Sequence, residues 1–233
     1  MREFAESTQL AGVTTLIGQA WCVEYRCPVC GFNGLTSKPY ATWPPPPGLA
    51  LSPPYEDLLG RPSYEVCPQC SFEFGNDDNP GTAEPVTFER YRAEYEAAAA
   101  AVELIESIRA TGASIGWRPG ASTAFLATVG AEWPLELRQI LHESNGFEDL
   151  TGQWEVSWSA DRIVDENVQL RASGVELPTD WLCFGDNGAG DFFALDRSTG
   201  GVHVVFGSSG ETLALAPTIS EFWLGWFTGR MTT

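Results

Sequence analysis

Two Cys-x-x-Cys motifs near the start of the chain constrain its fold more than any other feature. Residues 27–30 (CPVC) and 67–70 (CPQC) repeat one pattern. A Cys-x-x-Cys turn directs two thiolates at one centre, and two such turns supply the tetrahedral set of sulfur ligands that a structural zinc ion prefers. We therefore predict a closed zinc site, with a role in folding rather than catalysis, formed by Cys27, Cys30, Cys67 and Cys70.

The same cysteine pairs are also compatible with redox chemistry or with disulfide formation. A single Cys-Pro-x-Cys motif is also the dithiol centre of thioredoxin-like oxidoreductases, and paired cysteines can form disulfides. Neither pair follows a strong strand pattern and opens a helix, because residues 31–39 are rich in turn formers and residues 72–81 run into GNDDNPG. Metal binding is the favoured interpretation, with a dithiol centre or disulfides as the alternatives.

A proline-rich segment separates the two pairs. There are 36 residues between Cys30 and Cys67, more than the roughly 15–20 of a compact double-knuckle site. They include WPPPPG at 43–48 and SPP at 52–54. Consecutive prolines lack backbone donors and adopt polyproline II, which predicts an exposed loop rather than a helix or central strand. Docking of this segment into an aromatic groove of a partner is the alternative.

The residues around the pairs extend the pattern. The relevant segments are CPVCGF at 27–32, YEVCPQC at 64–70 and the acidic pair at 77–78. They resemble the bacterial cysteine-rich CPCC family of zinc-ribbon-like modules, but Val29 stands where the family's name expects a third cysteine and the proline loop is longer. The resemblance implies a metal-stabilised module and no particular activity.

A long helix is predicted after the second pair. Thr87 can cap its start, Gly112 can end it, and acidic residues early with Arg109 late suit the helix dipole. Apolar residues recur at steps of three and four, at Phe88, Tyr91, Tyr95, Ala98, Val102, Ile105 and Ile108. We expect this stripe to pack on the cysteine module; a solvent-spanning linker is the alternative.

The composition changes after this helix. All six tyrosines precede residue 96, whereas seven of the nine tryptophans follow residue 112, which implies a separate core. Helical patterns cover residues 122–129, 134–144 and 160–172, and Thr218 with Glu221 forms a capping box for a last aromatic helix. Strand patterns bounded by turn residues cover residues 153–158, 181–184, 191–195 and 202–206. In the helix at 160–172 we expect burial of Ile163, Val164, Val168 and Leu170.

The order of motifs in this half is distinctive. It comprises WPLEL at 133–137, SNG at 144–146, Trp158, GDNG at 185–188, GDF at 190–192 and LD at 195–196. This order and spacing resemble the SUKH superfamily. The resemblance implies an α+β fold, with an antiparallel sheet and flanking helices, and a non-enzymatic function. Many bacterial members are immunity proteins that neutralise a cognate toxin, often a nuclease, and fungal relatives are regulatory scaffolds.

These patterns divide the chain into four segments. We expect an N-terminal extension at 1–24, a zinc-ribbon-like module with its proline loop at 25–84, a connecting helix at 85–112 and a SUKH-like domain at 113–233. Cys22 and Cys183 stand outside the two pairs; Cys183 fits a buried core position, and Cys22 fits either a spare thiol or a neighbour of the metal.

The charge of the chain limits its partners. It carries 13 Lys and Arg against 31 Asp and Glu, a net charge of −18. This charge repels a phosphate backbone and favours encounter with a basic protein. No run approaches the roughly 20 apolar residues of a membrane span, and the first 21 residues do not form a convincing signal peptide. We expect a cytoplasmic protein that binds neither nucleic acid nor membrane.

The sequence offers few candidates for catalysis, and we predict no catalytic residue. His142 falls in a predicted helix and His203 in a predicted strand, where both suit structural or surface roles. Ser144 has no Gly-x-Ser-x-Gly elbow around it. Asp186, Asp191 and the nearby glycines match neither an EF-hand nor a phosphate loop, so turn formation explains them best.

The leading interpretation is therefore an immunity or interaction protein. Its second module would bind a basic toxin domain, with aromatic side chains as anchors beside acidic loop residues, namely Glu143, Glu148, Asp149, Asp186 and Asp191. The alternatives are a zinc-ribbon regulatory scaffold associated with nucleic acid, and an enzyme, either a dithiol oxidoreductase or an unrecognised hydrolase.

Overall fold

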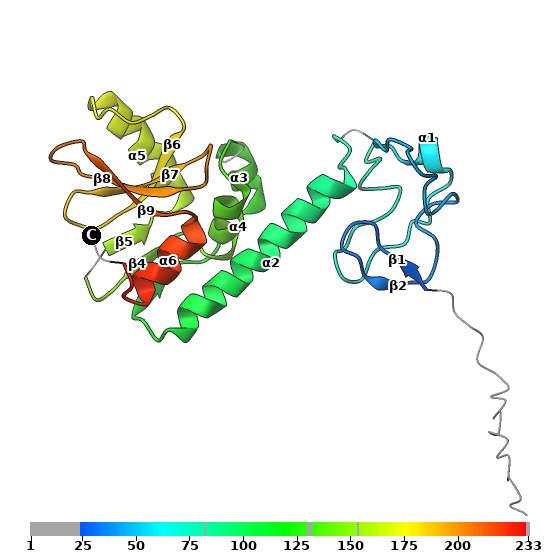
Figure 1. Cartoon of the computed structure of the whole chain (residues 1–233), viewed down its shortest axis with the longest axis horizontal. Coiled ribbons are helices and arrows are strands. Elements are labelled where there is room, and N and C mark those ends of the chain that lie inside the picture. The colour runs from blue at the N-terminus through cyan, green and yellow to red at the C-terminus, as the bar shows by residue number, and fades with distance from the viewer. Residues whose placement is uncertain (1–23, 82, 130–131, 153, 232–233) are drawn as a thin grey trace, which may run out of the picture. The chain divides into compact units, whose positions relative to one another are not determined.

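The computed structural model describes residues 24–81, 83–129, 132–152 and 154–231. The chain forms two compact units, Met1–Phe88 and Glu89–Thr233 (Figure 1). Cys22 and nearly all of the predicted N-terminal extension lie outside the described residues.

The first unit consists mostly of loops and turns. A short antiparallel pair joins β1 (Tyr25–Arg26) to β2 (Asn33–Leu35), and one helical turn forms α1 (Glu56–Leu59). Residues 44–54 adopt neither helix nor strand and are mostly exposed, as the prolines predict.

Aromatic side chains form the core of this unit. Tyr40, Tyr55 and Phe72 are fully buried, and Phe88 is nearly so. The rings of Tyr55 and Phe88 stack with centroids 4.0 Å apart, and the Tyr55 hydroxyl accepts a hydrogen bond from the Phe88 amide at 2.9 Å. A fully buried carboxylate, Asp78, lies among them. The unit therefore has a true hydrophobic core in addition to its cysteines.

Helix α2 (Phe88–Ala110) occupies the predicted segment, and three members of the predicted stripe, Phe88, Ile105 and Ile108, are buried. In the C-terminal half of the helix the buried side chains are Ala101, Leu104, Ile105 and Ile108, which belong to the core of the second unit. The predicted stripe is wrong at Val102, which is 41% exposed. The face toward that core therefore combines Ile105 and Ile108 of the predicted stripe with Ala101 and Leu104, and it leaves out Val102.

The second unit contains two antiparallel sheets. The smaller sheet has the order β3-β4-β5 and the larger is a β6-β7-β8-β9 meander. The amide of Trp158 donates to the carbonyl of Phe184 at 2.7 Å, which links the segment after β5 to β6. The strands are β3 (Ile115–Trp117), β4 (Phe147–Asp149), β5 (Trp154–Ser157), β6 (Trp181–Asp186), β7 (Phe192–Asp196), β8 (Val202–Val205) and β9 (Thr212–Ala216).

Four further helices flank these sheets (Figure 1). The Thr218 hydroxyl caps the last of them by accepting a hydrogen bond from the Glu221 amide at 3.1 Å, as the capping-box pattern predicts. Five aromatic and aliphatic side chains of that helix enter the core, including the fully buried Trp223. The helices are α3 (Thr123–Val129), α4 (Leu135–Glu143), α5 (Ala160–Ala172) and α6 (Ile219–Phe227).

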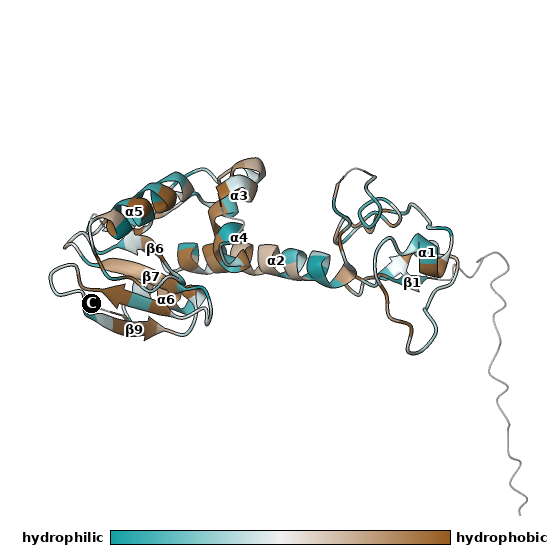
Figure 2. Ribbon diagram, turned by 90° about the horizontal axis from the view of Figure 1, so that it is seen from above, coloured by the Kyte–Doolittle hydropathy of each residue, from teal (hydrophilic) through white to brown (hydrophobic). Residues whose placement is uncertain are grey.

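Helix α5 has the predicted boundaries but not the full predicted burial. Hydrophobic and hydrophilic residues alternate along it (Figure 2). Ile163 and Leu170 are buried, whereas Val168 is 64% exposed and corrects the prediction. Asn167 is buried instead, because its side chain exchanges hydrogen bonds of 2.7–2.9 Å with the backbone of Cys183 in β6. A polar bridge between α5 and β6 thus replaces the expected apolar contact.

The α+β architecture and the antiparallel sheets are confirmed. One continuous core, built around Trp158, Trp223 and Phe193, fills the second unit. No helix in the described part of the chain combines the length and apolar character needed to cross a bilayer.

Candidate functional site

The two Cys-x-x-Cys turns have the same backbone geometry. In the first, the Gly31 amide donates to the Cys27 carbonyl at 3.0 Å; in the second, the Ser71 amide donates to the Cys67 carbonyl at 2.8 Å. Gly31 and Ser71 both have positive φ angles, 81° and 63°. The chain therefore repeats one turn twice, and each turn presents its two sulfurs on the same side.

The four sulfurs converge on one point. The Cys27 and Cys70 sulfurs are 3.9 Å apart, those of Cys30 and Cys67 are 3.7 Å apart, and all four lie within 4.8 Å of one another. Zinc–sulfur bonds of about 2.3 Å in a tetrahedron require sulfur–sulfur distances of about 3.8 Å. A disulfide would require about 2.05 Å. The arrangement fits a tetrahedral metal site, and the five described cysteines are free of disulfides.

The environment of these thiols also suits a cation. Burial raises the pKa of Cys27 to about 11, although amide groups of Cys30 and Val29 donate to its sulfur and oppose the rise. Burial likewise raises the pKa of Cys70. Thiols in such surroundings hold their protons unless a positive charge stabilises the thiolates. A divalent ion at the centre of the four sulfurs supplies that charge.

Glu65 connects the two segments that carry the cysteine pairs, a contact that the sequence did not predict. Its carboxylate accepts hydrogen bonds of 2.8 Å from the amides of Thr36 and Ser37. Burial opposes ionisation of Glu65, but the hydrogen bonds from Ser37 and Thr36 outweigh it and lower the pKa. Glu65 thus ties the segment after the first cysteine pair to the segment before the second. No local motif marks a glutamate that bonds to residues about 30 positions away.

A matched pair of substitutions tests the equivalence of the two turns. Ser71→Gly should stabilise the first unit by about 0.5–1 kcal/mol, because an L-residue at positive φ is strained and glycine is not. Gly31→Ala should destabilise it by about 1 kcal/mol for the same reason. Urea-induced metal release measures both effects. Shifts of the same sign in the two variants would show that the turns are not equivalent.

Cys183 does not join the cysteine cluster. It is fully buried in β6 within the core of the second unit, and burial raises its pKa to about 12. Its role is packing.

Three of the acidic residues predicted to bind a partner lie in α4 and β4. Glu143 is exposed at the end of α4. Glu148 forms an ion pair of 2.7 Å with Arg118. Asp149 is buried and accepts hydrogen bonds from the Trp226 indole at 3.1 Å and the Thr151 amide at 2.9 Å.

The other two flank the loop between β6 and β7: Asp186 is the last residue of β6, and Asp191 precedes β7. Asp186 accepts hydrogen bonds from the Trp158 indole at 2.6 Å and from Arg162 at 3.3 Å. Asp191 accepts from the Asn187 side chain at 2.9 Å and from a loop amide at 3.2 Å. Asp149, Asp186 and Asp191 thus shape their own loops.

Asp186 also belongs to a charged network that sequence analysis missed. Arg162 pairs with Glu155, with Glu166 at 3.2 Å and with Asp186, and its guanidinium lies 4.9 Å from the Trp158 ring centroid. Arg118 extends the network by pairing with Glu155 at 2.6 Å as well as with Glu148. The network joins four carboxylates to two guanidinium groups and has a formal charge of −2.

One cavity is lined both by Asp149 of β4 and by the loop between β6 and β7, through Asn187 and Ala189. Its volume is about 460 Å³. The indoles of Trp154 and Trp226 line it and meet edge to face with centroids 5.3 Å apart. Two aromatic rings beside a carboxylate attract a cationic side chain.

The side chains considered for catalysis have structural contacts. The Ser144 hydroxyl is buried and donates to the carbonyls of Arg118 at 3.1 Å and Gly146 at 3.0 Å. The His203 ring stacks on Trp181 with centroids 4.2 Å apart, and His142 lies 3.4 Å from Glu143.

Residues 123–225 match the model of the SMI1 / KNR4 family (SUKH-1). The matched segment lies entirely within the second unit and runs from the start of α3 into α6. It confirms the SUKH domain expected from the order of motifs. Comparison of the chain with curated proteins found no match.

Proposed function

We propose, from the premise that the second unit contains a SUKH domain, that this chain is a non-enzymatic bacterial immunity protein that binds and neutralises a toxin. The family match over residues 123–225 is the observation that carries the proposal. The protein would act in the cytoplasm, and its partner would be a basic toxin domain, as the net charge of −18 favours.

The cavity between Trp154 and Trp226 is the proposed anchor point for the partner. Well-packed aromatic pockets surrounded by polar groups are typical sites of high binding energy in protein interfaces. The exposed carboxylate of Glu143 and the half-exposed Glu148 would steer a basic surface toward this region. Asp149, Asp186 and Asp191 would act by holding the loops in shape, since each is engaged within the chain.

In this proposal the first unit holds one zinc ion through Cys27, Cys30, Cys67 and Cys70. Zinc would form four metal–thiolate bonds that link the two turns. A zinc ion with four sulfur ligands has no open coordination position for a reacting water molecule. The tetrahedral spacing of the sulfurs favours this role over a dithiol centre.

A regulatory scaffold is the second candidate function. It is favoured by one observation: the cysteine module is a compact unit outside the segment that matches the SUKH family. A zinc module separate from the binding domain can recruit a second partner. A toxin assay separates the two candidates, because a scaffold would give no protection.

Co-expression with a toxin encoded beside this gene tests the proposal directly. We expect the chain to rescue growth and to form a complex with the toxin. Glu143→Lys should weaken the complex about tenfold, mainly through slower association. Glu106→Lys is the matched control, because Glu106 is also exposed but lies on α2. Equal killing with and without the chain would refute the immunity role; equal effects of both variants would refute the proposed surface.

A further inference from the structure

Strand β9 forms an open edge of the larger sheet. The order β6-β7-β8-β9 gives β9 one neighbouring strand, whereas the opposite edge, β6, bonds to the segment after β5 through Phe184 and Trp158. Figure 2 shows β9 as a largely hydrophobic strand at the margin of this sheet. An open edge presents backbone N–H and C=O groups that can pair with another strand.

The ladder between β8 and β9 determines which groups point outward. The Phe206 amide donates to the Glu211 carbonyl at 2.9 Å, so these residues form a hydrogen-bonded pair beside the turn. Hydrogen-bonded and non-hydrogen-bonded pairs alternate along an antiparallel ladder. Leu213 therefore bonds to β8, whereas the N–H and C=O groups of Thr212 and Ala214 point away from it. No hydrogen bond from another segment of the described chain reaches either backbone.

The neighbouring ladder gives the same assignment. The Asp196 amide donates to the Gly201 carbonyl at 2.8 Å, at one end of the β7–β8 pairing. By the same alternation, the backbone groups of His203 point toward β7. His203 lies opposite Ala214. The backbone groups of Ala214 therefore have no partner in β8.

The side chains of this edge are uncharged and exposed. Leu213 is 56% exposed, and residues 212–216 contain no charged side chain. Sheets usually protect an open edge with lysine or another charged residue. The register shift beyond Ala214 confines the regular part of the edge to residues 212–214. This short segment is open to pairing with another strand.

We propose that β9 pairs antiparallel with β9 of a second copy of this chain and so forms a symmetric dimer. With the two-fold axis beside Leu213, Thr212 of each copy exchanges hydrogen bonds with Ala214 of the other. The two Leu213 side chains then lie directly opposite each other and bury apolar surface. Because each copy covers the open edge of the other, the assembly closes at two chains.

Charge favours a second copy as the occupant of this edge. Glu211 is the only charged residue among residues 211–217. In this register the two copies of Glu211 lie about 14 Å apart along the strands, at about 3.4 Å per residue. That separation exceeds the screening length of about 8 Å at physiological ionic strength. An uncharged strand offers a basic toxin no attraction, so the inference is independent of the function proposed above.

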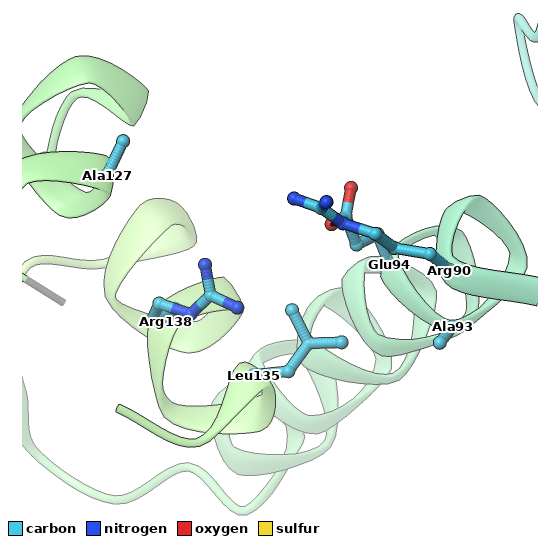
Figure 3. Close-up of a pocket in the computed structure, with 6 residues that line it drawn as sticks. All are labelled: Arg90, Ala93, Glu94, Ala127, Leu135 and Arg138. Atoms are coloured by element: carbon cyan, nitrogen blue, oxygen red, sulfur yellow. Dashed lines mark hydrogen bonds and ion pairs between the residues drawn. The ribbon is translucent and has the colours of Figure 1, made fainter. Parts of the chain in front are cut away.

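The cavity between α2, α3 and α4 is less suited to contact between copies. Arg90, Glu94 and Arg138 line it (Figure 3). Burial of these charged groups against an identical surface would cost desolvation energy and bring like charges together. Pairing through β9 has no such cost.

Sedimentation and amide exchange of the full, metal-loaded chain test the proposal. From micromolar to millimolar concentration, the average mass should rise from one chain to two. Exchange of the Thr212 and Ala214 amides should slow over the same range, whereas the Leu213 amide, bonded to β8, should be protected throughout. The proposal is overturned by a chain that stays monomeric, by assembly beyond two copies, or by a dimer without slower exchange at Thr212 and Ala214.

A pair of substitutions separates this edge from general surface effects. Leu213→Lys should weaken dimerisation at least about tenfold, because it removes the apolar contact and places like charges directly opposite each other. Val168→Lys is the matched control, since Val168 is an aliphatic residue that is 64% exposed on α5. Both variants should keep the melting temperature of the original chain. Unchanged dimerisation of Leu213→Lys, or equal weakening by both variants, would overturn the proposal.

Discussion

Removal of zinc is expected to unfold the first unit and to leave the second unit folded. The first unit has only five strand residues and one four-residue helix, and its two cysteine turns are 36 residues apart in sequence. Structural zinc contributes on the order of 10 kcal/mol to the folding of small modules. The second unit has its own core of tryptophan, phenylalanine and aliphatic side chains and holds none of the four clustered cysteines.

Metal content and backbone NMR spectra measure this result. The intact chain should contain one zinc ion, and treatment with a strong chelator should collapse the amide signals of residues 25–81 while those of the second unit stay dispersed. Cys67→Ser should reproduce the effect, whereas Cys22→Ser, the matched control, should keep the metal. A chelated protein that retains a folded first unit would show that the aromatic core suffices without metal.

Acidification should release the same ion. Burial holds the pKa of Cys27 near 11 in the absence of metal, so metal must displace a proton there to bind. Lower pH therefore weakens binding, because protons compete for the sulfurs.

Local patterns in the sequence anticipated the parts of the fold that depend on local interactions. Helix α5 has its predicted boundaries, and the capping box at Thr218 opens α6 where expected. In the second unit, strands β3, β4 and β9 were missed. β3 and β4 have three residues each, too few to show a period, and they exist because Ile115 pairs with Asp149 from 34 positions away. β9 is longer, but three of its five residues are exposed, so no alternation of apolar and polar residues marks it.

The distinction between local and long-range interactions also applies to the candidate sites. The cysteine cluster could be predicted because each pair forms a local turn, and because four cysteine sulfurs in two such turns typically bind one metal ion. The hydrogen-bond partners of the acidic side chains could not be predicted. Asp186 looked like a free loop carboxylate, but Trp158 and Arg162, far away in sequence, both donate to it. Contacts of that kind are set by the tertiary fold and leave no periodic signal.

Asp78→Ala should destabilise the first unit by about 3–5 kcal/mol, the largest effect we expect from a substitution outside the cysteines, because it removes a buried carboxylate that accepts three hydrogen bonds. Asp78 is fully buried and accepts hydrogen bonds from the Tyr40 hydroxyl at 2.7 Å, the Tyr55 amide at 3.0 Å and the Gly75 amide at 2.8 Å. Alanine would take the shared acceptor away from three buried donors, and a buried donor that loses its acceptor costs about 1–3 kcal/mol.

Zinc release during urea denaturation reports on the first unit alone and measures this loss. Tyr40→Phe is the matched comparison, because it removes one donor and leaves the carboxylate with its two amides; it should lose only about 1–2 kcal/mol. Burial and the hydrogen bond to Asp78 also raise the pKa of Tyr40. Asp78→Asn keeps the shape but not the charge, so an intermediate loss is expected. If Asp78→Ala released zinc at the same urea concentration as the original chain, the metal site would be independent of the aromatic core around Asp78.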